Sequence, residues 1–286
     1  MGSGRGVPTF LIAFGAASLL AVAAGAYVAE RSGVTPRVLG LNLAAWIAGF
    51  AAALALVRRA GGRSAAAFAL VSLIVLALTL VSPGLQGVHR WVQAGPLRLN
   101  AAELFAPGLV VALAAAGWGR PWPWLAGSAA MAVLVVQPDA SQATAMAFAL
   151  AVSLWLSPTP RWGRLAGSLA CGAAAATAWL RPDPLAPVPE VEEIFRLAGQ
   201  VSPVALALAA GALAVACASP LLIAHVAKPR PAALALSAYL AVSAAAPLLG
   251  AFPTPLVGMG VSPILGFWLA VGLVAALARR RDAPAP

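Results

Sequence analysis

Residues 261 to 278 read V-S-P-I-L-G-F-W-L-A-V-G-L-V-A-A-L-A, a run of eighteen residues without a charge. A helix rises about 1.5 Å per residue, so an apolar run of this length is a candidate for crossing a bilayer. The composition of the whole chain agrees, because 62% of its 286 residues are hydrophobic and only 9% are charged. The mean hydropathy is +0.92. This composition excludes a soluble globular enzyme and indicates a helical membrane protein.

Apolar runs of this kind follow one another along the chain, separated by charged residues or by Pro and Gly breaks. Ten runs meet this description, and they cover residues 8 to 29, 38 to 57, 65 to 82, 101 to 117, 121 to 136, 140 to 157, 165 to 180, 203 to 225, 231 to 249 and 261 to 278. We therefore expect an all-α polytopic membrane protein with about ten transmembrane helices, formed by a single domain over residues 1–286. The longest segments between runs are 83 to 100 and 181 to 202.

The basic residues predict the orientation of these helices, because cytoplasmic segments of membrane proteins carry an excess of Lys and Arg. Placing both termini in the cytoplasm puts twelve of the eighteen Lys and Arg residues on that side. Seven of the eight acidic residues then lie outside, with Asp282 as the exception. Acidic residues have little influence on topology, so chemistry at the outer face is one explanation of their bias. The twelve inner basic residues are Arg5, Arg58, Arg59, Arg63, Arg120, Arg161, Arg164, Lys228, Arg230, Arg279, Arg280 and Arg281.

The sequence lacks the common cofactor and metal motifs. Cys171 and Cys217 fall inside apolar runs, and His89 and His225 lie on opposite sides of the membrane in this topology, so we expect no metal site of the zinc type. A P-loop, a dinucleotide fingerprint and a GxSxG elbow are also missing. The net charge of +10 comes mainly from basic residues on the cytoplasmic side, where they set the topology and face anionic lipids. The positive charge therefore does not predict binding to nucleic acid.

Ionisable side chains next to the apolar runs are the candidates for function. In the segment 83 to 104, Arg90 and Trp91 precede Glu103 at the mouth of the fourth run. Arg90 is expected either to pair with Glu103 or to bind the phosphate of an anionic lipid head group. Asp139 stands just before the sixth run, where an N-cap residue is expected.

The segment 181 to 196 holds four acidic residues and two arginines, the densest group of charges in the chain. One interpretation is a solvated acidic loop. The other is a reactive site, in which a carboxylate acts as a general base and the arginines stabilise a phosphate leaving group.

Four motifs resemble, in the same order, those of one known family. G-V-H-R-W at 87 to 91 and L-N-A-A-E-L at 99 to 104 are similar to G-x-x-R-W and Q-P-S-E-L, and Q-P-D at 137 to 139 is identical to the family motif. F-P-T-P-L-V-G-M-G-V-S at 252 to 262 resembles P-x-P-F-x-S-Y-G-G-S. Besides these four, the segment V-P-E-V-E-E-I-F at 188 to 195 resembles L-P-E-x-x-T-D-F-I-F, the segment of the family that carries its catalytic position. The family is SEDS (shape, elongation, division and sporulation), the RodA/FtsW-like peptidoglycan glycosyltransferases with ten spans.

The resemblance implies polymerisation of lipid II, the disaccharide linked to undecaprenyl pyrophosphate, at the outer face of the cytoplasmic membrane during cell elongation or division. It implies a catalytic carboxylate at Glu192, with Glu193 as the alternative. A class B penicillin-binding protein and membrane lipids are the implied partners, and a divalent cation is the candidate cofactor. Arg98 is a further candidate for holding the pyrophosphate. The implied substrate-binding residues are Arg90, Trp91, Glu103, Asp139, Arg181, Arg196 and Ser262.

Two other interpretations stay open. A catalytically degenerate relative would bind lipid II or a partner protein without polymerising. Three departures from the family favour it: Glu192 replaces an Asp, the outer loop is shortened, and Gly258 and Met259 replace Ser-Tyr. A lipid flippase or transporter would carry charged groups near the middle of the membrane around broken helices, whereas nearly all charges here lie at the ends of the runs.

Overall fold

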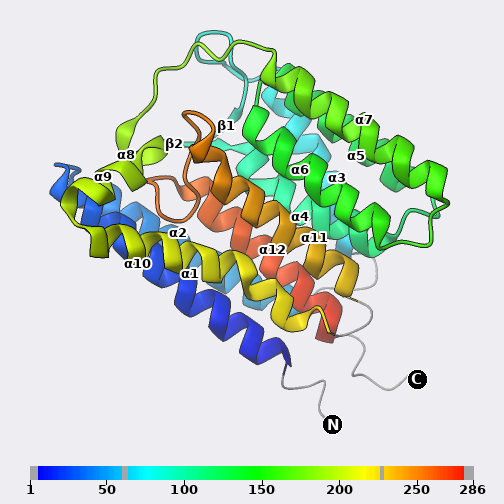
Figure 1. Ribbon diagram of the computed structural model, residues 1–286, viewed down its shortest axis with the longest axis horizontal. Coiled ribbons are helices and arrows are strands. Elements are labelled where there is room, and N and C mark those ends of the chain that lie inside the picture. Colours follow the sequence, from blue (N-terminus) through cyan, green and yellow to red (C-terminus); the bar gives the residue numbers. More distant parts are fainter. Residues whose placement is uncertain (1–5, 60–63, 226–228, 280–286) are drawn as a thin grey trace.

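The computed structural model describes residues 6–59, 64–225 and 229–279. Six charged residues used in the topology prediction lie outside these ranges, namely Arg5, Arg63, Lys228, Arg280, Arg281 and Asp282. Figure 1 shows a bundle of long helices whose connecting segments gather at its two ends.

The first part of the chain forms the following elements: α1 (Gly6–Arg31), α2 (Pro36–Arg59), α3 (Ser64–Thr79), β1 (Trp91–Ala94), β2 (Leu97–Asn100), α4 (Ala101–Ala116), α5 (Pro121–Val136), α6 (Ala140–Trp155) and α7 (Arg161–Trp179). The second part forms α8 (Pro189–Glu192), α9 (Ile194–Val201), α10 (Pro203–Ala218), the 3-10 helix η2 (Ser219–Ile223), α11 (Arg230–Ala245), the 3-10 helix η3 (Ala246–Leu248) and α12 (Val261–Arg279).

These elements confirm the prediction of an all-α polytopic membrane protein. Each predicted apolar run coincides with one long helix to within a few residues, and the short helices α8 and α9 lie in the segment 181 to 202. Within the described ranges, five helical stretches are long and apolar enough to cross a membrane. They are α1, α2, α10 with η2, α11 with η3, and α12. Ten membrane crossings remain a prediction.

Polar caps and prolines determine where several helices begin. The side chains of Asn100, Asp139 and Ser202 accept hydrogen bonds from backbone N–H groups in the first turns of α4, α6 and α10, respectively. Such caps satisfy donors that have no partner within the helix. α4 ends at Gly117, whose φ of +75° is a conformation that glycine adopts without strain.

Helices α4 and α12 form the centre of the bundle. Thirteen of the sixteen residues of α4 and fourteen of the nineteen of α12 are buried. Trp268 of α12 is fully buried and packs edge-on against Phe14 of α1, Trp46 of α2 and Phe50 of α2, with ring centroids 4.8 to 5.4 Å apart. By contrast, only two of the nineteen residues of α7 are buried, and this helix lies at the edge of the bundle (Figure 1).

The outer surface of the bundle is apolar, as expected for helices that face lipid. Large side chains such as Ile12, Ile47, Leu70 and Leu169 are more than half exposed. Together with the five membrane-capable helices, this surface identifies a multi-pass membrane protein. The start of α1 and the end of α12 lie at the same end of the bundle (Figure 1), as the predicted topology requires.

The segment 83 to 100 is more ordered than the predicted loop, because it contains a hairpin. β1 and β2 pair antiparallel, with Ala94 opposite Leu97 and Trp91 opposite Asn100. Gly95, with φ of +60°, lies in the two-residue turn between the strands. Each strand has only four residues, too few for a clear alternating pattern in the sequence.

Candidate functional site

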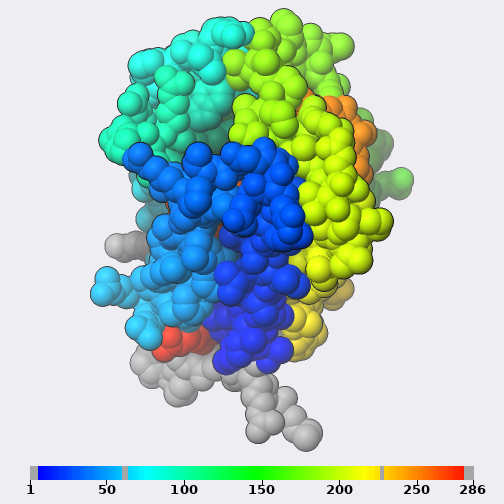
Figure 2. All heavy atoms as spheres, turned by 90° about the vertical axis from the view of Figure 1, so that its left-hand side faces the viewer, coloured from blue at the N-terminus to red at the C-terminus, as the bar shows by residue number. Residues whose placement is uncertain are grey.

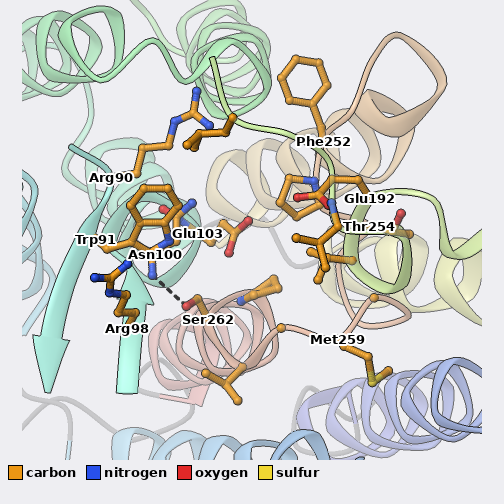
Figure 3. A pocket seen from close by; sticks show the side chains of 18 of the residues that line it. Arg90, Trp91, Arg98, Asn100, Glu103, Glu192, Phe252, Thr254, Met259 and Ser262 are labelled. Carbon is orange, nitrogen blue, oxygen red and sulfur yellow. Dashed lines mark hydrogen bonds between the residues drawn. The ribbon is translucent and has the colours of Figure 1, made fainter. Parts of the chain in front are cut away.

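A cavity of about 370 Å³, lined by polar and apolar residues, opens at the end of the bundle where the hairpin lies. Figure 2 looks onto the molecule from the left-hand side of Figure 1, where the blue, cyan-to-green and yellow-green parts of the chain meet around a recess. The side chains that bring charge or hydrogen-bonding groups to the cavity wall are Asn42, Arg90, Trp91, Arg98, Asn100, Glu103, Asp139, Ser141, Asp183, Glu192, Thr254 and Ser262. Figure 3 shows most of these in close-up.

One side of the cavity, here called the helix wall, is formed by β2 and by the first turns of α4, α6 and α12. Asn100 caps α4, and its backbone N–H donates a 2.9 Å hydrogen bond to Ser262 Oγ at the start of α12. Glu103 follows in the first turn of α4 and is only 8% exposed. Its carboxylate points into the cavity (Figure 3) and has no hydrogen-bond partner among the described residues.

Arg90 is held by groups from two other segments, although Glu103 was one of its predicted partners. Its Nε donates to the carbonyl oxygen of Gln137 at 3.2 Å, and its Nη2 donates to the carbonyl oxygen of Pro138. The same Nη2 lies 2.8 Å from Asp183 Oδ2, and Nε lies 3.8 Å from Asp139 Oδ2.

The prediction that Arg90 pairs with Glu103 is therefore wrong. The hairpin directs the arginine toward the segment between α5 and α6, whose buried carbonyl oxygens and N-cap carboxylate surround the guanidinium. Sequence proximity favoured Glu103, but the carbonyl oxygens of a helix end are acceptors that a sequence motif does not reveal.

The motif Gln137-Pro138-Asp139 thus has a structural role. The Gln137 side chain is fully buried and donates to Thr79 Oγ1 at the end of α3. Asp139 is 3% exposed and caps α6, accepting from Gln142 N at 3.2 Å, which confirms the predicted N-cap. The motif joins α3, α6 and Arg90 at one point next to the cavity.

The opposite side of the cavity, here called the loop wall, consists of residues 183–192 and 251–260. Glu192 ends the short helix α8 and faces the cavity across from Glu103 (Figure 3). Its Oε2 accepts a hydrogen bond from Val188 N at 2.5 Å. Burial raises the pKa of the Glu192 carboxyl above its usual range, and the hydrogen bond from Val188 N opposes that shift.

Backbone hydrogen bonds join the two segments of the loop wall. Thr254 N donates to Val191 O at 3.0 Å, and Met259 N donates to Glu190 O at 2.9 Å. A Cβ atom on Gly258 would lie only 2.5 Å from Val191 O, so this close approach requires glycine. The buried Asn42 of α2 donates a 3.0 Å hydrogen bond from its side-chain amide to Gly258 O, which ties the loop wall to the bundle.

The predicted site residues divide into two groups in the structure. Arg90, Trp91, Glu103, Asp139, Glu192 and Ser262 line the one cavity. Glu193 and Arg196 do not line it; they form an ion pair with each other on the exposed side of α9. Arg181 is exposed and also lies outside the lining.

Five of these polar lining residues were not among the predicted site residues, namely Asn42, Asn100, Ser141, Asp183 and Thr254. Asn100 and Thr254 lie inside quoted motifs, Ser141 lies two residues after Asp139, and Asp183 lies in the charged segment 181 to 196, so their proximity to predicted residues was the available signal. Asn42 lies in a span for which no motif was recognised. Its signal was a lone amide in an apolar run, because a polar side chain within a membrane helix needs a partner.

The carboxylates at the cavity do not form a metal site. Within the described ranges, no three His, Cys, Asp or Glu side chains lie together in a way that would hold a metal ion. Asp183 and Asp139 already face Arg90, which supplies the positive charge that a cation would otherwise bring. The divalent cation suggested by the family resemblance stays a prediction, and no step below depends on one.

The fold is similar to those of several solved structures. The rod shape determining protein RodA of Thermus thermophilus superposes with a TM-score of 0.71 at 24% identity, over 96% of this chain and 97% of that one. An aspartate-to-alanine mutant of the same protein gives a TM-score of 0.73 at 23% identity, over 96% and 98%. A peptidoglycan synthase complex, described as coordinating polymerization and crosslinking, gives 0.69 at 22%, over 94% and 98%.

No protein family model and no curated protein matches the sequence significantly. The structural similarity extends over nearly the whole of both chains, so it concerns the complete bundle and not one helical hairpin. The resemblance to the SEDS family is thus confirmed at the level of the fold: this chain is a multi-pass membrane protein with the fold of RodA.

Proposed function

We propose that this protein is a RodA/FtsW-like peptidoglycan glycosyltransferase, which polymerises lipid II at the outer face of the cytoplasmic membrane. The observation that carries the proposal is the position of Glu192. This carboxylate lies on the wall of the cavity, and burial raises its pKa. The bundle that carries it superposes on RodA over nearly its whole length. A carboxyl group with a raised pKa is better matched to proton transfer near neutral pH than an ordinary one.

In the proposed reaction, the Glu192 carboxylate removes the proton from the acceptor sugar hydroxyl. The hydroxyl oxygen forms a bond to the anomeric carbon of the donor sugar. The bond from that carbon to the pyrophosphate oxygen breaks, and its electron pair leaves with undecaprenyl pyrophosphate. The hydrogen bond from Val188 N occupies Oε2, so Oε1, which accepts no hydrogen bond from any described residue, is the oxygen that would take the proton.

The helix wall supports this chemistry by its rigidity. Glu103 and Ser262 project from the first turns of the central helices α4 and α12, and Asn100 links those turns. A sugar bound between Glu103 and Glu192 would be oriented by groups whose positions are set by helix packing. Positioning of this kind contributes to rate by reducing the entropy lost in the reaction.

A transpeptidase partner is part of the proposal. The peptidoglycan synthase complex with the same fold is described as coordinating polymerization with crosslinking. We infer a class B penicillin-binding protein as the partner, and cell elongation or division as the process.

The test is polymerisation of labelled lipid II by the purified protein, alone and with its cognate penicillin-binding protein, with the products resolved by gel. Glycan ladders from the wild type that disappear in Glu192→Gln support the proposal. The matched control is Glu30→Gln, which removes one exposed carboxylate at the end of α1 and lies outside the cavity lining. Glu193→Gln tests the neighbouring carboxylate; loss of ladders in that variant alone would transfer the role of base to Glu193.

A catalytically inactive relative that binds lipid II is the second candidate. One observation favours it: Glu192 Oε2 is occupied by a short hydrogen bond within its own helical turn. If this candidate is correct, the wild-type protein should bind lipid II but form no polymer, either alone or with a penicillin-binding protein.

A further inference from the structure

The structure distinguishes four arginines that the sequence treated alike as candidates for binding phosphate. Arg90 is 8% exposed, and its guanidinium contacts two carbonyl oxygens and two carboxylates. A phosphate group would have to displace Asp183 from Arg90 to reach it. Arg196 is paired with Glu193 outside the cavity, and Arg181 is outside the lining. None of these three presents a free guanidinium to the cavity.

Arg98 differs from the other three. It lies on β2, its side chain is exposed, and it lines the cavity. No ion pair or side-chain hydrogen bond joins its guanidinium to any described residue. Arg98 and Asn100 are two residues apart on one strand, so their side chains share a face. Asn100 is fixed on that face by its bonds to α4 and to Ser262.

We propose that Arg98 binds the pyrophosphate of an isoprenoid pyrophosphate, and that Arg90 is a positioning residue which holds the loop wall through Asp183. A guanidinium suits this ligand because its planar N–H groups donate two parallel hydrogen bonds to phosphate oxygens. This assignment rests on the proposed function, which it deepens by separating the arginine that contacts the ligand from the arginine that shapes the site.

Charge and apolar surface around Arg98 agree with an amphiphilic ligand. Figure 3 shows Arg98 beside Trp91 on the helix wall, with Glu192 on the opposite wall, so an anion at Arg98 stays away from the proposed base. The cavity is also lined by Val38, Leu41 and Leu97, which are each 36% to 41% exposed. These exposed apolar side chains offer a path for a hydrocarbon chain that leads out of the cavity.

Equilibrium binding to the purified full chain in detergent tests the assignment. Isothermal titration calorimetry would use three probes: farnesyl pyrophosphate, inorganic pyrophosphate and farnesol. The variants are Arg98→Ala and Arg98→Lys. Arg37→Ala is the matched control, because Arg37 is exposed at the start of α2, one residue from the lining residue Val38, and does not itself line the cavity.

We expect farnesyl pyrophosphate to bind the wild type and to bind Arg98→Ala about 10-fold more weakly, the effect of losing one hydrogen-bonded charge at an exposed site. Arg98→Lys should recover part of the affinity, and Arg37→Ala should bind like the wild type. If inorganic pyrophosphate binds the wild type more weakly than farnesyl pyrophosphate does, the site is assigned to a lipid pyrophosphate. If the two probes bind equally tightly and both lose affinity in Arg98→Ala, the site is assigned to the free anion.

Unchanged binding of farnesyl pyrophosphate by Arg98→Ala would overturn the proposal, as would equal losses in Arg98→Ala and Arg37→Ala or equally tight binding of farnesol. Matching thermal unfolding profiles of the variants exclude misfolding as a cause. The polymerisation assay is independent of this result. Glycan ladders together with unaltered binding by Arg98→Ala would reject only this inference, whereas Arg98-dependent binding without ladders would reject only the polymerase.

Discussion

On the helix wall, Asn100, Glu103 and Asp139 stand in or beside the first turns of long helices, and the caps at Asn100 and Asp139 accept from backbone N–H groups only two or three residues further on. On the loop wall, Glu192 stands in a helix of four residues, which depends on backbone bonds to the segment 251–260 more than sixty residues away. The helix wall is therefore determined largely by local signals and the loop wall by long-range contacts. The two walls should respond differently to substitution.

Arg90 joins the two walls, so Arg90→Gln should have the largest effect. The variant would leave Asp139 buried without its cation and would release Asp183, and breaking a buried ion pair from one side costs about 3–5 kcal/mol. Unfolding in detergent measures the loss. Arg37→Gln is the control, with no change expected. A loss below about 1 kcal/mol would show that water satisfies these groups.

Gly266 of α12 packs tightly against the start of α4, which carries Glu103 of the helix wall, and Gly266→Val should be next in magnitude. A Cβ atom there would overlap Glu103 O and lie 2.9 Å from Leu104 Cα, and overpacking of this kind costs about 1–3 kcal/mol. The same substitution at Gly40 of α2, which has open space around it, controls for helix propensity. Equal thermal stability of the two variants would contradict the close contact.

Asn42→Ala should affect the loop wall more than the bundle. It removes one of the two hydrogen bonds to Gly258 O, which also accepts from Gly260 N, and the loss of one intramolecular hydrogen bond costs about 0.5–1.5 kcal/mol. We expect a modest loss of thermal stability and a clear loss of polymerisation, because Gly258 supports the segment that carries Glu192. The adjacent Leu43→Ala, at a 47% exposed position, is the control. Full activity of Asn42→Ala would show that the loop wall does not need this bond.

The smallest effect concerns the protonation of Glu192. Burial raises the pKa of this carboxyl, so the base form should accumulate only above the usual Glu pKa of about 4.3. The polymerisation rate should therefore rise with pH, with a midpoint above that value. Because the raised pKa favours the protonated form in the folded state, stability should fall slightly as pH rises through it, and Glu192→Gln should remove this dependence. If the rise in polymerisation rate had its midpoint at or below about pH 4.3, Glu192 would be excluded as the titrating group.

Much of the bundle was predictable from the sequence. An apolar run extends over many residues and is visible in the sequence alone, and a membrane helix forms its backbone hydrogen bonds within itself. The positions of α1 to α7 and α10 to α12 therefore follow from hydropathy. The N-cap at Asp139 was also local, since a carboxylate before an apolar run can reach the next turn. The hairpin β1–β2 was missed because four-residue strands carry too little periodicity.

The partners of the charged residues were not predictable in the same way. The sequence indicated that Arg90 needs an anion and that Glu192 belongs near the reactive site. Only the tertiary structure showed that Arg90 contacts Asp183, that Asn42 supports Gly258, and that Arg98 alone among the four candidate arginines lines the cavity unpaired with any described residue. The physical reason is range: the free energy of membrane helices depends on composition along each helix, whereas an ion pair depends on which helix ends meet after packing.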